Sequence, residues 1–227
     1  MAKGRNRITS FRVMIAMGVA LALLSVSSAA LFIRFASAPP LAISFWRCFA
    51  GALFFSTLAA FRRLKSRNCS SSSSKVFSTS SFVGAVLAGF FLAAHFATWI
   101  TSLFYTPVAV SVVLVCTQPL FVTLFSVLWL KERTSFFAVF GMFVAFAGSM
   151  GIALQAEAGV RIEGMTSWRG PVLALLGAVF VAGYMLFSRK LRSEGVALVP
   201  FAALVYASAA FVLGGAALVF GQELSGA

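Results

Sequence analysis

Apolar segments of membrane-spanning length recur along the whole chain, with short polar or charged stretches between them. Crossing the hydrocarbon core of a bilayer, about 30 Å thick, takes roughly 20 helical residues. A helix also satisfies its own backbone hydrogen bonds in hydrocarbon. The pattern therefore predicts an all-α polytopic membrane protein with about seven transmembrane helices, at residues 13–34, 41–61, 82–103, 107–130, 136–155, 170–188 and 197–220.

The third segment carries polar side chains along one face. His95 is the only histidine in the chain, and Trp99 and Ser102 follow it at offsets that place all three on the same side of a helix. A polar ring deep in a bilayer is costly unless it has a partner or lines a wet cavity. His95 is thus either a neutral ring bonded to a neighbouring carbonyl or part of a solute path. Trp99 is either an interfacial aromatic or a pocket wall.

The fourth segment carries its polarity at a similar depth, and only the short uncharged connection 103–107 separates it from the third. Thr117 and Gln118 stand near its middle and are followed by Pro119. Proline removes one backbone hydrogen bond and obstructs the carbonyl four residues earlier, so we expect a kink at Pro119. We predict a tight helical hairpin, with Thr117 and Gln118 meeting a solute between the two segments.

Arg47 and Tyr184 extend this candidate site. Arg47 lies about six residues, roughly 9 Å, into the second segment. It either reaches the outer headgroups as an anchor or holds a substrate carboxylate or phosphate. Tyr184, in the sixth segment, is a further candidate for the same cavity. The predicted substrate-binding residues are Arg47, His95, Trp99, Ser102, Thr117, Gln118 and Tyr184.

Composition narrows the function classes. The chain is 61% hydrophobic and 10% charged, with a mean hydropathy of +1.00, which excludes a soluble globular protein. It contains no aspartate and only five glutamates, so few carboxylates are present to act as acid–base catalysts or metal ligands. The three cysteines have no metal-ligand spacing. We expect neither an enzyme nor a metal site nor a cofactor.

Basic residues predict the orientation. The formal charge of +13 is spread in short clusters between apolar segments. This pattern is typical of the loops of membrane proteins and differs from the continuous basic face of a nucleic-acid-binding protein. All but four of the eighteen Lys and Arg residues fall on one side of the predicted topology, the exceptions being Arg34, Arg47, Arg161 and Arg169. The positive-inside rule then places the N-terminus in the cytoplasm. The serine-rich stretch 66–81 is predicted to be a flexible cytoplasmic linker.

An internal echo suggests a repeat. Residues 20–36 are similar to residues 172–188, and an odd number of spans between equivalent positions inverts the second copy in the membrane. We therefore predict an inverted five-helix repeat, with a first repeat at residues 1–155 and a partial second repeat of two helices at residues 156–227.

An ordered run of features resembles a known family. The polar-faced third segment, the sequence SLFYTPVAVSVVLVCTQPL, the following LKERTS and the glycine-bearing segment after it resemble EamA-type members of the drug/metabolite transporter superfamily. This resemblance implies ten helices in two inverted halves, alternating access, and small metabolites such as amino acids, often exported. The chain would then lack the last three helices of that fold.

The leading hypothesis is a secondary transporter, an exporter of small metabolites such as amino acids in the cytoplasmic membrane. Its expected partners are a small-molecule substrate and the lipid bilayer, and no nucleic acid. A second copy of the chain, or the missing C-terminal helices, would complete the transporter. The alternative is a truncated, transport-inactive membrane protein or a fragment of a ten-helix transporter. A retinal-binding receptor fits poorly, because the last segment, 197–220, has no lysine for a Schiff base.

Overall fold

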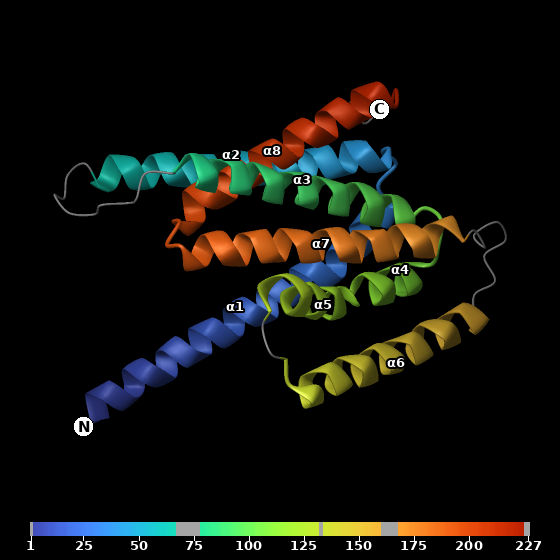
Figure 1. Cartoon of the computed structure of the whole chain (residues 1–227), viewed down its shortest axis with the longest axis horizontal. Helices are drawn as coiled ribbons and strands as arrows, with labels where there is room; N and C mark the ends of the chain where they lie inside the picture. Colours follow the sequence, from blue (N-terminus) through green and yellow to red (C-terminus); the bar gives the residue numbers. More distant parts are fainter. Residues whose placement is uncertain (1, 67–77, 132–133, 160–167, 225–227) are drawn as a thin grey trace. The chain divides into compact units, whose positions relative to one another are not determined.

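The computed structural model describes residues 2–66, 78–131, 134–159 and 168–224. Regular structure in these ranges is entirely helical (Figure 1). The helices are α1 (Ala2–Phe35), α2 (Pro40–Ser66), α3 (Thr79–Ser102), α4 (Val108–Val115), α5 (Gln118–Leu130), α6 (Phe136–Gly159), α7 (Arg169–Ser193) and α8 (Leu198–Val219). Most of the serine-rich stretch predicted to be a linker lies outside the described residues.

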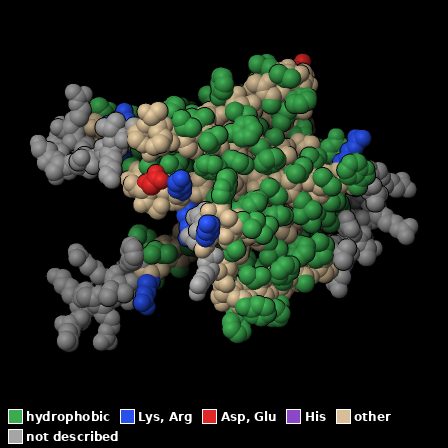
Figure 2. Space-filling model, viewed as in Figure 1, with side chains coloured by type: hydrophobic (Ala, Val, Ile, Leu, Met, Phe, Trp, Pro, Cys, Tyr) green, Lys and Arg blue, Asp and Glu red, His purple; other side chains and the backbone are tan. Residues whose placement is uncertain are grey.

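The predicted polytopic membrane fold is confirmed. Within the described ranges, six helical stretches are long and apolar enough to cross a membrane: Arg12–Phe35, Pro40–Lys65, Thr79–Ser102, Val108–Trp129, Arg169–Ser193 and Leu198–Val219. The one remaining predicted span, residues 136–155, corresponds to α6, in which the apolar stretch Phe136–Gly148 is shorter. Hydrophobic side chains cover most of the visible face, while Lys and Arg lie toward the helix ends (Figure 2). A surface of this kind suits lipid rather than water.

The predicted fourth span is interrupted rather than continuous. Helix α4 ends at Val115, and α5 begins two residues after Cys116. The Thr117 N–H donates to the Leu114 carbonyl at 3.2 Å, and the Leu120 N–H donates to the Thr117 carbonyl at 2.9 Å. Pro119 thereby falls in the first turn of α5, where backbone N–H groups have no intrahelical acceptor and a missing donor costs little. The expected kink at Pro119 is thus a break between two helices.

The chain forms two compact units, Met1–Ala36 with α1 and Ser37–Ala227 with the remaining helices. In the second unit α3 packs against α7 and α8, and α2 packs against α8. Helix α7 also packs against α4 and α5, so it lies between α3 and the broken span (Figure 1). The turn after α3 is short, as predicted. The two arms of the predicted hairpin, α3 and the broken span, make little direct contact, because α7 lies between them.

Small side chains line the contacts of α3. Ala85 and Ala88 of α3 and Ala174, Ala178 and Ala182 of α7 are all fully buried. Helices in a membrane gain mainly from close van der Waals packing, which small residues permit. This packing fixes α3 within the second unit. The predicted domain boundary at residue 155 and the inverted repeat stay predictions.

The start of α2 is bound to the segment after α8. The side-chain oxygen of Gln222 accepts a hydrogen bond from the Leu41 N–H at 3.1 Å, and Trp46 Nε1 donates to the Leu224 carbonyl at 2.8 Å. The first N–H groups of a helix have no intrahelical partner. Gln222 therefore acts as a cap supplied to α2 by a distant part of the chain.

Candidate functional site

His95 projects from α3 toward α7 and is 8% exposed. Its Nδ1 lies 2.9 Å from the Gly177 carbonyl oxygen. A carbonyl oxygen can only accept, so Nδ1 carries the proton, and Nε2 of a neutral ring is then an acceptor. The interpretation of His95 as a ring bonded to a neighbouring helix therefore holds for one nitrogen, and the second nitrogen retains its lone pair.

Gly177 allows this approach. A Cβ at this position would lie 3.2 Å from the Cβ of Trp99 and 3.3 Å from Oγ1 of Thr98. A methyl group at this position would therefore press on the side chains of Thr98 and Trp99. The glycine thus brings its carbonyl within reach of His95.

Aromatic rings surround His95. The Trp99 ring lies parallel to the imidazole, with 5.8 Å between centroids and 7° between planes, and the Phe96 ring is tilted at 5.1 Å. Trp99 is 7% exposed, and its Nε1 is buried without a hydrogen-bond partner in the described part of the chain. Trp99 is therefore an inner wall and not an interfacial aromatic. Its indole N–H can only donate.

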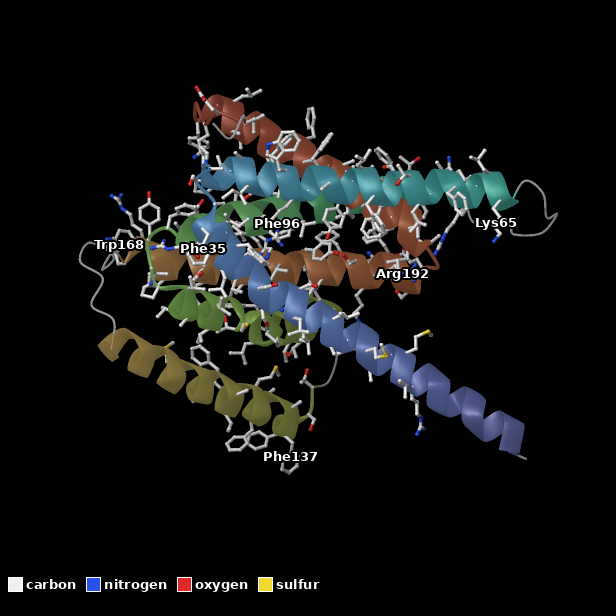
Figure 3. All side chains as sticks on the ribbon, turned by 180° about the vertical axis from the view of Figure 1, so that it is seen from behind. Phe35, Lys65, Phe96, Phe137, Trp168 and Arg192 are labelled. Carbon is white, nitrogen blue, oxygen red and sulfur yellow. The ribbon has the colours of Figure 1, made fainter. Side chains whose placement is uncertain are left out.

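Arg47 turns from α2 toward these rings. Its Cζ lies 5.1 Å from the Phe96 ring centroid and 5.9 Å from that of Trp99, within the range of cation–π attraction. Phe96 lies between α2 and α7 in the view of Figure 3. Ser44 Oγ, one turn before Arg47, lies 3.3 Å from the Phe96 carbonyl oxygen, which shows how closely α2 meets α3 here. Arg47 is half-buried, so it is an inward cation rather than an outward anchor.

A tyrosine of α8, Tyr206, lies near Arg47. Tyr206 interacts electrostatically with Arg47 and Tyr184, and its ring stacks on Phe55 at 5.6 Å. Tyr184 and Tyr206 are both packed against the main apolar cluster of the second unit. The sequence interpretation included Tyr184 but missed Tyr206, Phe96 and Gly177. Phe96 stands directly after His95, which was the one available signal.

The remaining candidates lie elsewhere. Ser102 Oγ is 2.6 Å from Ser111 Oγ and 2.6 Å from the Trp99 carbonyl oxygen, joining the end of α3 to α4. Thr117 Oγ1 donates to the Leu114 carbonyl at 2.6 Å, within its own turn. Gln118 is half-buried at the start of α5. Because α7 lies between α3 and the broken span, Thr117 and Gln118 are separated from His95 (Figure 1).

The structure thus brings Arg47 of α2 together with His95 and Trp99 of α3, and His95 in turn reaches α7. These groups offer the guanidinium N–H donors, one indole N–H and one imidazole acceptor, which suits binding a polar solute. Among the described residues, no three His, Cys, Asp or Glu side chains are grouped as metal ligands would be.

The fold and site define a class: an all-helical, multi-pass membrane protein with a cation and a polar cluster enclosed between its helices. The sequence model of the EamA-like transporter family matches residues 13–154, more than half of the chain. The chain belongs to this family, whose members are membrane transporters of the drug/metabolite transporter superfamily, and the resemblance is confirmed. No curated protein and no solved structure matches the chain.

Proposed function

We propose that the protein is a secondary transporter that exports small metabolites, such as amino acids, by alternating access across the cytoplasmic membrane. Its family supports transport. The observation that carries the site is the half-buried guanidinium of Arg47, which lies over Trp99 beside His95. Buried polar groups of this kind are expensive in a membrane and mark solute paths.

Basic residues support an orientation with the N-terminus inside. Lys65 and Arg192 lie at one end of α2 and α7, and Trp168 lies at the opposite end (Figure 3). Arg63 and Lys190 belong to the same last turns as Lys65 and Arg192. Lys and Arg accumulate in cytoplasmic loops. The end with Lys65 and Arg192 is therefore the cytoplasmic one in this proposal, and solute would leave toward the end with Trp168.

The broken span supports a role in alternating access. Interrupted helices are common near the sites of secondary transporters, because the unpaired backbone groups and the bend allow one segment to move against another. The break at Cys116 and Thr117 lies between α4 and α5, both of which pack against α7. In this proposal α4 and α5 tilt separately, and each moves α7 relative to the His95 site.

The proposal is tested in proteoliposomes, by counterflow of each labelled proteinogenic amino acid. The wild-type chain should accumulate at least one of them above protein-free vesicles. A His95→Ala variant should lose flux about tenfold, the effect of one contact to a charged or polar solute. Thr57→Ala, at an exposed position of α2 whose hydroxyl bonds within its own helix, is the control and should retain most of the flux. Equal flux from the wild type and His95→Ala would remove His95 from the path.

Association with a second copy and additional C-terminal helices both stay predictions. Size measurements on the reconstituted chain, at several protein-to-lipid ratios, would test the first.

A further inference from the structure

Hydrogen-bond donors exceed acceptors around Arg47. The guanidinium has only donors, and so has the indole of Trp99, whose Nε1 is buried without a partner in the described residues. In the described part of the chain, the groups that interact electrostatically with Arg47 are Cys48, Tyr206 and His95, none of which is a carboxylate. Unpaired buried donors and an uncompensated cation cost free energy. The missing component is an acceptor with negative charge.

Aromatic contacts hold the Arg47 side chain in a defined place. Its Cζ lies within cation–π distance of both Phe96 and Trp99. Such contacts use the faces of the rings and leave N–H groups at the rim of the planar guanidinium. That rim is the part that binds a carboxylate with two parallel hydrogen bonds. The aromatic pair therefore restrains Arg47 without replacing its natural partner.

Neighbouring residues on α2 show that Arg47 does not face the lipid side. Trp46 is 52% exposed and Phe49 is 44% exposed, so this part of α2 presents aromatic rings outward. Cys48 is fully buried, and Arg47 points to α3. A lipid headgroup would meet Trp46 and Phe49 first. A solute between the helices would meet Arg47.

From these observations we infer that Arg47 and the indole N–H of Trp99 form the subsite that binds the carboxylate of the transported solute. The inference deepens the proposed function and rests on it. A carboxylate fits better than a phosphate, because a single guanidinium balances one negative charge and no lysine or second arginine is among the groups that interact with Arg47 in the described part of the chain.

The test measures binding to the full chain in nanodiscs of phosphatidylcholine, which has no net charge. Isothermal titration follows each proteinogenic amino acid, the amide of the best-binding one, and inorganic phosphate. The variants are Arg47→Gln, Arg47→Lys, which keeps the charge without the planar fork, and Arg63→Gln, an exposed arginine of the same helix as matched control. Each variant is first checked for the wild-type thermal unfolding profile.

The wild type should bind the best amino acid about tenfold more tightly than its amide, as expected for a desolvated charge pair. In Arg47→Gln this ratio should fall close to one, in Arg47→Lys it should be intermediate, and in Arg63→Gln it should not change. The ratio compares two ligands on the same variant, so partial loss of folded protein does not mimic the effect. An undiminished ratio in Arg47→Gln would overturn the inference.

Other outcomes also decide against it. Binding of phosphate alone, dependent on Arg47, would assign the subsite to phosphate esters. If no solute binds, and phosphatidylglycerol stabilises the wild type but not Arg47→Gln, the guanidinium holds a lipid headgroup. Arg47-dependent carboxylate binding without flux in proteoliposomes would instead support the subsite and contradict only transport.

Discussion

The sequence placed His95 and Thr117 in one predicted site, but in the structure their hydrogen bonds differ in kind. His95 of α3 bonds to the Gly177 carbonyl on another helix, whereas Thr117 between α4 and α5 bonds to the Leu114 carbonyl three residues earlier. Both are polar groups deep in apolar spans. The difference teaches that polarity within a span indicates a shared site only when the polar atom finds its partner on a neighbouring helix.

The two regions also differ in how tightly their surroundings are packed. A Cβ at Gly89 of α3 would lie 1.9 Å from Ser208 Oγ and 2.7 Å from the Val205 carbonyl oxygen, both on α8. At Gly141 and Gly148 of α6, which packs on α4 and α5, a Cβ would meet nothing within 4 Å. Helix α3 is thus tightly packed against α8 at Gly89, whereas Gly141 and Gly148 lie on the exposed surface of α6.

The largest effect is expected from Gly89→Ala, which tests this contrast directly. The added methyl group would force α3 and α8 apart, and overpacking of this kind costs about 1–3 kcal/mol. Unfolding in mixed detergent micelles, followed by circular dichroism, measures the change. Gly141→Ala, with open space around it, is the control and should be neutral within error. Equal stability of both variants would mean that α3 is no more tightly held than α6.

A smaller effect separates the two polar groups. His95→Leu removes a hydrogen bond between helices and should cost about 1 kcal/mol in the same unfolding measurement, the upper part of the range for such bonds in membranes. Thr117→Val removes a bond within one turn and should cost a few tenths, because the Leu114 carbonyl also accepts from the Thr117 N–H. A larger cost for Thr117→Val would reverse the ranking of the two regions.

A change in stability no larger than that of His95→Leu is expected from Pro119→Ala. Alanine supplies an N–H that can bond to the Val115 carbonyl and join α4 to α5, for a net change of about 1 kcal/mol or less. Cys116 at the break is exposed and Cys48 is fully buried, so a membrane-permeant maleimide should label Cys116 first in a Cys69→Ser background. In Pro119→Ala the labelling of Cys116 should slow. Unchanged labelling would show that the break does not depend on the proline.

Much of the fold follows from the sequence alone. Apolar length is enough to predict a polytopic helical protein, because hydrocarbon admits few other structures. The position of the interruption also follows, since Pro119 cannot donate to Val115. What periodicity cannot supply is the identity of neighbouring helices. Nothing in residues 82–130 indicates that α7, some fifty residues further along, lies between the two arms of the hairpin.

The site was predicted in part for the same reason. His95 and Arg47 were selected because a titratable or cationic group in an apolar span is expensive wherever it sits, and Trp99 because it shares a helical face with His95. Gly177 and Tyr206 were missed because their roles depend on a partner helix. Glycine occurs in membrane helices for several reasons, and the role of Gly177 becomes visible only once its carbonyl is seen to bond to His95.

The bonds from Gln222 and Leu224 to the start of α2 have a consequence for motion. Pro40 has no N–H and Leu41 donates to Gln222, so the first turn of α2 is anchored to the far end of α8 rather than to water. Helices α2 and α8 are hydrogen-bonded at one end and packed along their length, so we expect them to move together. Arg47 lies about two turns from these bonds, so in the transport cycle proposed above it would keep its place relative to α8 while α2 and α8 move as a pair.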